Sequence, residues 1–195
     1  MKKISSTLII IVALIVLVLW GIGIYNKLVA QEETVNSQWA NVENQYQRRA
    51  DLIPNLVETI KGYAKHESAT FEAVVAARAK ATQVTVDPKN LTPEKMQEFQ
   101  AAQGELSTAL GRLLMITENY PDLKANQNFL ELQAQLEGTE NRISTERTRF
   151  NEVAKAFNTA IRKVPNNLIA SFGNFEKKPY FEAEEGSEKA PKVQF

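Results

Sequence analysis

The stretch "TLIIIVALIVLVLWGIGI", residues 7–24, decides the fold, because it holds 18 consecutive residues without a charge. Counting back to Ile4, the uncharged stretch reaches 21 residues. A helix needs about 20 apolar residues to cross the hydrocarbon core of a bilayer. A cleaved signal peptide has a shorter apolar core of about 7–15 residues and a small-x-small cleavage site. The best such site here, Leu28–Ala30, begins with leucine. We therefore predict an uncleaved transmembrane anchor over residues 1–28, in contact with the membrane through residues 4–24.

The charges that flank this stretch predict its orientation. Lys2 and Lys3 precede it, whereas Lys27 alone lies near its other end. By the positive-inside rule, the N-terminus lies in the cytoplasm and the rest of the chain outside it. Trp20 and Tyr25 fall where an interfacial aromatic belt is expected. The sequence thus predicts a single-pass membrane protein, with the part of the chain after the anchor outside the cytoplasm.

Composition narrows the function classes. The chain of 195 residues carries 23 Lys+Arg, 23 Asp+Glu and no cysteine. Zero net charge without a basic block argues against nucleic-acid binding. Without cysteine, disulfides, thiol nucleophiles and thiolate metal sites are impossible.

Beyond the anchor, apolar residues recur at steps of three and four, which is typical of helices that pack along a seam, as in coiled coils. The first seam passes through Arg49, and two further seams follow it. The three seams begin at Val35, Met96 and Phe129 and run to Ala64, Tyr120 and Ile161. Such seams on antiparallel neighbours predict bundle packing.

Capping residues and prolines mark where the predicted helices begin and end. Thr92 and Pro93 read as an N-cap and first helical residue, Pro121 marks a tight break, and Pro165 ends the last seam. A weaker break is expected near His66, because an unbroken helix over residues 30–82 would extend about 80 Å at 1.5 Å per residue; that single long helix is the alternative. The predicted fold class is all-α, an N-terminal transmembrane helix followed by an antiparallel four-helix bundle over residues 29–165. A short apolar segment and extended tail follow over residues 166–195.

Long motifs carry a family resemblance. "RRADLIPNLVETIKGYAKHE" at residues 48–67, the segment at 118–158 and the closing "FEKKPYFEAEEGSEKAPKVQF" together resemble the LemA family. The resemblance implies a bacterial envelope protein with one N-terminal membrane helix and a four-helix bundle, and it implies no established activity. With the predicted orientation, it implies a single-pass protein of the bacterial inner (cytoplasmic) membrane with an extracytoplasmic bundle. Phe150 departs from the tyrosine usual in that family, which puts any role for a hydroxyl there in doubt.

Candidate catalytic residues are sparse. His66-Glu67 resembles the start of an HExxH zinc motif, but His66 is the chain's only histidine. Zinc and di-iron sites of the known types need more than one histidine when cysteine is absent. Asp51 and Glu58 share a helical face and would serve acid–base chemistry, yet nothing positions a substrate beside them. We expect no cofactor, no metal and no catalytic residue.

The stretch around Pro54 is predicted to shape a helix. Pro54 cannot donate a hydrogen bond to Ala50, so a kink is expected, with Asp51 and Asn55 as partners for the freed groups. Arg49 is placed on the seam, as is Glu146, and a buried ion pair between them would set the register of the helices. Structural or partner-binding candidates are Arg48, Arg49, Asp51, Pro54, Asn55, His66, Glu67 and Glu146.

After Pro165, four aromatic residues are expected to lie back on the bundle, namely Phe172, Phe175, Tyr180 and Phe181. From about residue 183 the chain is too charged to pack. It ends in Val193-Gln194-Phe195, the form of ligand that PDZ grooves bind by strand addition. An idle tail is the alternative.

These observations favour a membrane-tethered, non-enzymatic adaptor or scaffold of the bacterial envelope that presents a bundle face and its tail to protein partners. A PDZ-containing envelope protein is one candidate partner. A carboxylate-based enzyme or metal-binding bundle and a lipid-surface remodelling protein are the alternatives. Neither the partner nor the oligomeric state follows from the sequence.

Overall fold

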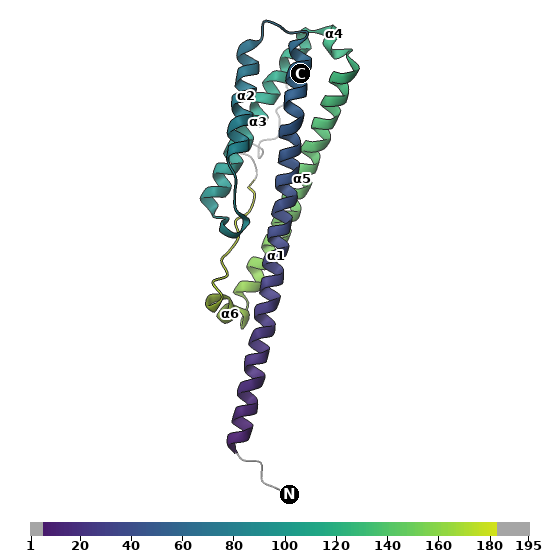
Figure 1. Ribbon diagram of the computed structural model, residues 1–195. Helices are drawn as coiled ribbons and strands as arrows, with labels where there is room; N and C mark the ends of the chain where they lie inside the picture. Colours follow the sequence, from purple (N-terminus) through teal and green to yellow (C-terminus); the bar gives the residue numbers. More distant parts are fainter. Residues whose placement is uncertain (1–5, 183–195) are drawn as a thin grey trace, which may run out of the picture.

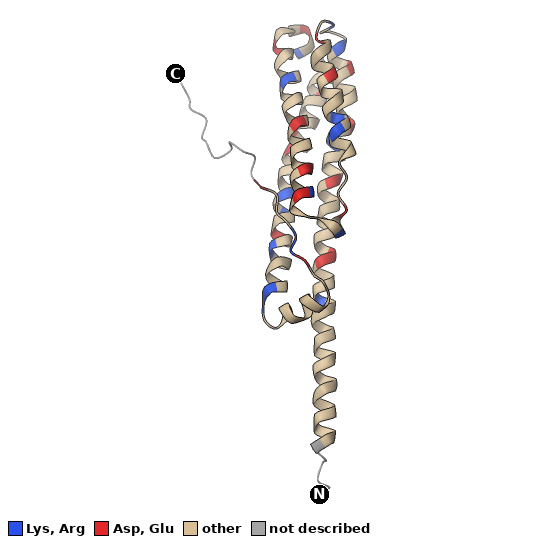
Figure 2. Ribbon diagram, turned by 90° about the vertical axis from the view of Figure 1, so that its left-hand side faces the viewer, with Lys and Arg blue, Asp and Glu red and all other residues tan. Residues whose placement is uncertain are grey.

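The computed structural model describes residues 6–182, and nearly all of its regular structure is helical. Helix α1 covers Ser6–Lys61 without interruption and spans about 84 Å at 1.5 Å per residue. Its N-terminal end extends beyond the other helices and carries neither blue nor red in Figure 2. The apolar part is long and hydrophobic enough to cross a membrane, with a mean hydropathy of 3.0. The all-α class and the long apolar N-terminal helix are therefore confirmed.

Beyond the apolar segment, three further long helices lie alongside α1 (Figure 1). These are α2 (Ser68–Gln83), α3 (Pro93–Ile116) and α5 (Gln127–Arg162). Two short helices complete the fold: α4 (Pro121–Lys124) beside the end of α1, and α6 (Asn166–Phe172) near the apolar segment. The 3-10 turns η1 (Pro88–Asn90) and η2 (Thr117–Asn119) precede α3 and α4.

The predicted break between α1 and α2 is confirmed, and the unbroken alternative is wrong. Helix α1 ends at Lys61 and α2 begins at Ser68. The turn follows Gly62, and the buried Ala64 caps the helix end with its N–H on the carbonyl of Ile60, 2.9 Å away. The predicted cap at Thr92 is also present, since its hydroxyl accepts from the N–H of Lys95 at 3.3 Å.

The core consists of two apolar clusters, one above the other. The cluster farther from the apolar segment takes side chains from all four long helices, including Ile53, Phe71, Leu106 and Phe129. The nearer cluster centres on Trp39, which is fully buried. Trp39 makes an edge contact with Phe150 (ring centroids 5.6 Å apart). Phe150 is fully buried, so a tyrosine hydroxyl there would have to find a partner in an apolar core.

Pro54 lies inside α1, on its exposed side. Because Pro54 has no N–H, the carbonyl of Ala50 lacks its regular helical donor. Arg78 of α2 replaces that donor: its Nε donates to the Ala50 oxygen at 2.7 Å. The expected partners, Asp51 and Asn55, do not fill this role, because both side chains are exposed on the outer face and Arg78 reaches the carbonyl from a neighbouring helix. The proline thus opens a docking point for α2.

Replacing Arg78 with methionine should lower the free energy of unfolding by about 1–2 kcal/mol, because the buried Ala50 carbonyl loses its donor while the aliphatic stem is kept. In a Pro54→Ala background the same replacement should cost about 0.5 kcal/mol or less, since residue 54 then donates to Ala50. Pro54→Ala alone should leave stability equal or higher. Denaturant unfolding of the full chain in detergent measures all four proteins; equal costs of Arg78→Met in both backgrounds would contradict this role of the proline.

Candidate functional site

Arg49 is the most deeply buried charged residue among those singled out from the sequence, with 2% of its side chain exposed. Its Nη1 donates to Glu140 of α5 at 2.8 Å and to the Ser107 hydroxyl at 2.9 Å. Its Nη2 donates to the side-chain oxygen of Gln103 at 2.6 Å. The guanidinium also lies over the ring of Tyr46, 5.1 Å from its centroid. One side chain of α1 therefore binds α3 and α5 together.

The predicted Arg49–Glu146 pair is wrong. Glu146 accepts from Gln38 at 2.6 Å and pairs with Arg149 at 2.7 Å. Helices α1 and α5 run in opposite directions, so a residue farther along α1 than Gln38 meets a residue earlier in α5 than Glu146, and Arg49 meets Glu140. The seam pattern identified Arg49 as an inward position but could not establish which glutamate it meets.

The Arg49 network leaves little room for a small organic molecule. The cavity beside the guanidinium, lined by Tyr46, Gln100 and Arg147 among others, holds about 50 Å³. Small-molecule sites are usually about 300–1,000 Å³. Gln103, which binds Arg49, also donates to the carbonyl of Ala81 at 3.2 Å and so adds α2 to the network.

The remaining candidates on α1 face outward. Arg48, Asp51 and Asn55 are exposed. The carboxylate of Asp51 accepts from Gln47 at 2.8 Å, and that of Glu58 accepts from Lys61 at 2.8 Å. These two carboxylates are therefore held by neighbouring surface side chains.

His66 and Glu67 lie in the turn between α1 and α2, and His66 is exposed. Glu67 accepts a hydrogen bond of 3.2 Å from the hydroxyl of Tyr120, which precedes α4. Burial, together with the Glu67 carboxylate, raises the pKa of Tyr120. This contact joins the α1–α2 turn to the α3–α4 turn. Within residues 6–182, no group of three or more His, Asp or Glu side chains is placed to hold a metal ion.

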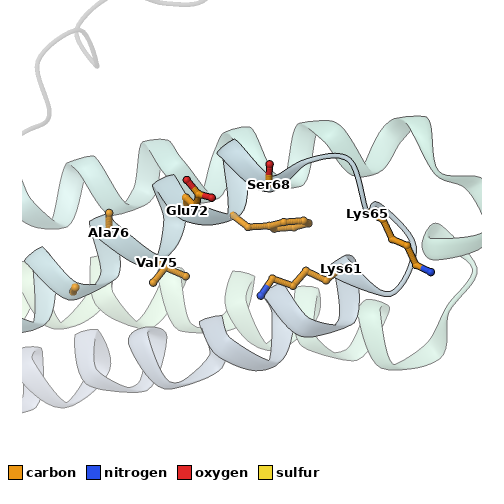
Figure 3. A pocket seen from close by; sticks show the side chains of 8 residues that line it. Lys61, Lys65, Ser68, Glu72, Val75 and Ala76 are labelled. Carbon is orange, nitrogen blue, oxygen red and sulfur yellow. The ribbon is translucent and has the colours of Figure 1, made fainter.

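An open groove lies beside this turn, between the end of α1 and the outer face of α2 (Figure 3). It has a volume of about 620 Å³. Phe71, Val75 and Ala76 give it an apolar lining, and Val75 is 55% exposed. Lys61 and Lys65 border it, with the Lys61 ammonium 5.9 Å from the Phe71 ring centroid. The sequence pattern did not predict this groove, because Val75 and Ala76 belong to none of the three seams.

The segment after α6 runs back along α5 and is held by two asparagines. The amide of Asn158 donates to the Lys178 carbonyl at 2.8 Å and accepts from the Lys178 N–H at 2.9 Å. Asn151 forms the same pair of bonds with Phe181, at 2.9 and 2.8 Å. These residues are seven apart, two turns of one helix face, so each replaces a peptide group of a neighbouring strand. No sequence motif pointed to them.

Side chains of the same segment enter the core. Phe181 stacks on Trp39 with ring centroids 5.7 Å apart. Lys178 has only 4% of its side chain exposed, and its ammonium pairs with Glu32 of α1 at 2.8 Å. Of the four aromatics expected to lie back, Phe175 and Phe181 pack against the core, and Tyr180 contacts α5 through its hydroxyl, which accepts from Asn158 at 3.0 Å. Tyr180 is partly exposed, and Phe172 is 88% exposed, which contradicts the expectation for Phe172. Val193 and Phe195, the tail candidates, lie outside the described residues.

Replacing Glu140 with alanine should lower the free energy of unfolding by about 2–3 kcal/mol, because the buried Arg49 would keep only neutral acceptors. Glu146→Ala, the matched control on the same helix, should cost about 1 kcal/mol or less, since its Arg149 partner is exposed. Both are measured by denaturant unfolding of the full chain in detergent. A larger cost at Glu146 would contradict the observed pairing.

The sequence of this chain is similar to those of a known family and of several known proteins. The profile of the LemA family matches residues 38–195. The chain is 26% identical to magnetosome protein MamQ 2 of Paramagnetospirillum magneticum over 175 residues, which is 81% of this chain and 64% of that protein. It is 27% identical to magnetosome protein MamQ of Magnetospirillum gryphiswaldense over 174 residues, again 64% of that protein.

A third relative is the protein LemA of Metamycoplasma hominis, 23% identical over 164 residues, which cover 84% of this chain and 71% of that protein. The chain thus spans less than two thirds of the length of the magnetosome relatives. Because the family profile covers most of the chain, including α2, α3, α5 and the α1–α2 turn, the chain belongs to the LemA family.

Proposed function

We propose that the chain is a non-enzymatic, membrane-tethered helical adaptor of the bacterial envelope, in which α1, α2, α3 and α5 form an antiparallel four-helix bundle. The far core cluster, to which all four helices contribute, supports the bundle. The apolar third of α1 supports membrane attachment. Lys2 and Lys3 support an N-terminus in the cytoplasm and a bundle outside it.

The observation that carries the proposal is the position of the groove. Helix α1 is continuous from its apolar segment to Lys61. Lys61 lies 37 residues beyond Ile24, or about 55 Å along a straight helix axis. The groove bordered by Lys61 and Lys65 therefore lies far from the bilayer, at the distal end of α1. Surface apolar grooves of this kind serve as contact sites for partner proteins.

The groove chemistry specifies the partner segment. Its apolar lining fits one face of an amphipathic helix, which buries side chains at i, i+3 and i+4 in such grooves. Two lysines, Lys61 and Lys65, and one acidic residue, Glu72, line the groove, so its net positive charge favours acidic residues beside that face, because complementary charge at a rim steers association. We therefore expect a partner protein with an amphipathic, acid-flanked helix.

Site-specific photocrosslinking in intact membranes tests the proposal. A benzophenone side chain at position 75, in the groove, should capture one protein. The same probe at position 130 should not, although Leu130 is also apolar and 44% exposed. Lys65→Glu should reduce the yield of the adduct about tenfold through charge repulsion at the rim. Lys89→Glu, in the 3-10 turn η1 that follows the other end of α2, should leave the yield unchanged.

Several outcomes would overturn the proposal. Equal capture at positions 75 and 130, or an adduct indifferent to Lys65→Glu, removes the groove as a docking site. An adduct between two copies of this chain would make the groove a self-association surface. A captured protein confined to the cytoplasm would reverse the proposed orientation.

A further inference from the structure

Helix α6 exposes apolar side chains that the rest of the described structure leaves uncovered. Leu168 is 60% exposed and Phe172 is 88% exposed, and the two lie four residues apart on one face of α6. Val164, just before the helix, is 80% exposed. The opposite face packs inward, since Ala170 is 4% exposed. A seven-residue helix with a bare aromatic face needs an apolar environment on that side.

The inward face of α6 lies against the apolar segment of α1. A Cβ added at Gly21 would lie 3.6 Å from Ile169 Cδ1, so the Ile169 side chain reaches the surface of α1 at that glycine. The rings of Tyr25 and Phe175 are 5.5 Å apart. Gly173 permits this approach, because a Cβ there would lie 2.6 Å from the Phe175 ring and 3.0 Å from that of Tyr25.

Between α6 and α1 lies an apolar cleft of about 530 Å³ that extends from Leu17 to Tyr25 along α1 and includes Leu168 and Phe172. Leu17 is seven residues from Ile24, the end of the uncharged stretch. Seven residues correspond to about 10 Å along the helix axis. If the bilayer covers residues 4–24, the cleft and the outer face of α6 fall within the depth of about 5–10 Å that interfacial helices occupy.

The charged residues around α6 suit a position at the lipid headgroups. Exposed cations precede and follow it, at Arg162, Lys163 and Lys177, against one exposed acid, Glu176. Lys27 lies at the end of the apolar segment. Figure 2 shows blue, and no red, on the end of α5 that leads into α6. Basic residues beside an apolar face are the composition of helices that bind at the headgroup boundary.

We propose that α6 is a second membrane contact, which inserts Leu168 and Phe172 into the headgroup–acyl boundary of the bilayer that α1 crosses, with lipid acyl chains filling the cleft. Two apolar elements at different positions would restrain the tilt of the helical body, which a single span leaves free. The restraint reaches the body through α5 and through the Lys178–Glu32 pair, 2.8 Å long. This proposal does not depend on the groove or its partner.

Lipid-based quenching tests the proposal in the full chain. The chain has no cysteine, so Phe172→Cys carries a single environment-sensitive fluorophore after labelling. The protein is reconstituted into vesicles of phosphatidylcholine and phosphatidylglycerol that contain nitroxide-labelled lipid. Met115→Cys is the matched control, because Met115 is apolar, 71% exposed and in the last turn of α3. Leu168→Cys repeats the test at a second position, and circular dichroism confirms unchanged helix content.

We expect at least about threefold stronger quenching at positions 172 and 168 than at 115, and stronger quenching by nitroxides near the headgroup than by those near the chain end, because the insertion is shallow. Quenching at both positions no greater than at 115 would overturn the proposal. A blue-shifted emission without lipid quenching would also overturn it, and would assign the apolar face to a protein neighbour.

Discussion

The structure depends on one constraint: the apolar seam of α1 continues well beyond the segment that can enter a membrane, and it must be covered. Helix α1 has 56 residues, whereas α5 has 36, α3 has 24 and α2 has 16. No single described helix therefore matches it. Helix α5 accompanies most of α1, while α2 and α3 pack chiefly on each other. The segment after α6 fills the remaining gap, where Phe181 covers Trp39. Because different elements cover different parts of α1, the core forms two clusters rather than one.

Apolar seams alone would allow these helices to slide, and buried polar contacts set their register. Arg49 joins α1 to α3 and α5, Arg78 joins α2 to the carbonyl that Pro54 frees, and Lys178 joins the returning segment to Glu32. Each places a charged group where desolvation is costly unless its partners are in place. A shifted helix would leave such a group unpaired, so these contacts favour one arrangement over its neighbours.

Local signals in the sequence were sufficient for the elements but not for their pairing. The cap at Thr92, the break after Gly62 and the inward position of Arg49 each follow from a few adjacent residues. The partner of Arg49 depends on the register of α5. Glu146 lies on the seam, whereas Glu140, 91 residues from Arg49 along the chain, lies beside it, so the seam pattern favoured the wrong glutamate. Asn151 and Asn158 carry no motif, because any amide can pair with a peptide group. The groove and the exposed face of α6 were likewise hidden, since both arise only when helices end beside one another.

The central claim is that α1 is one rigid post that carries its distal end away from the membrane. A distance measurement between spin labels at positions 26 and 58, both exposed on α1, tests it most directly in lipid nanodiscs, because the chain has no other cysteine. The two positions are 32 residues apart, and a continuous helix predicts a single narrow distribution near 48 Å, at about 1.5 Å per residue. A broad distribution, or one centred well below that distance, would show a hinge between the apolar segment and the helical body and would contradict the account.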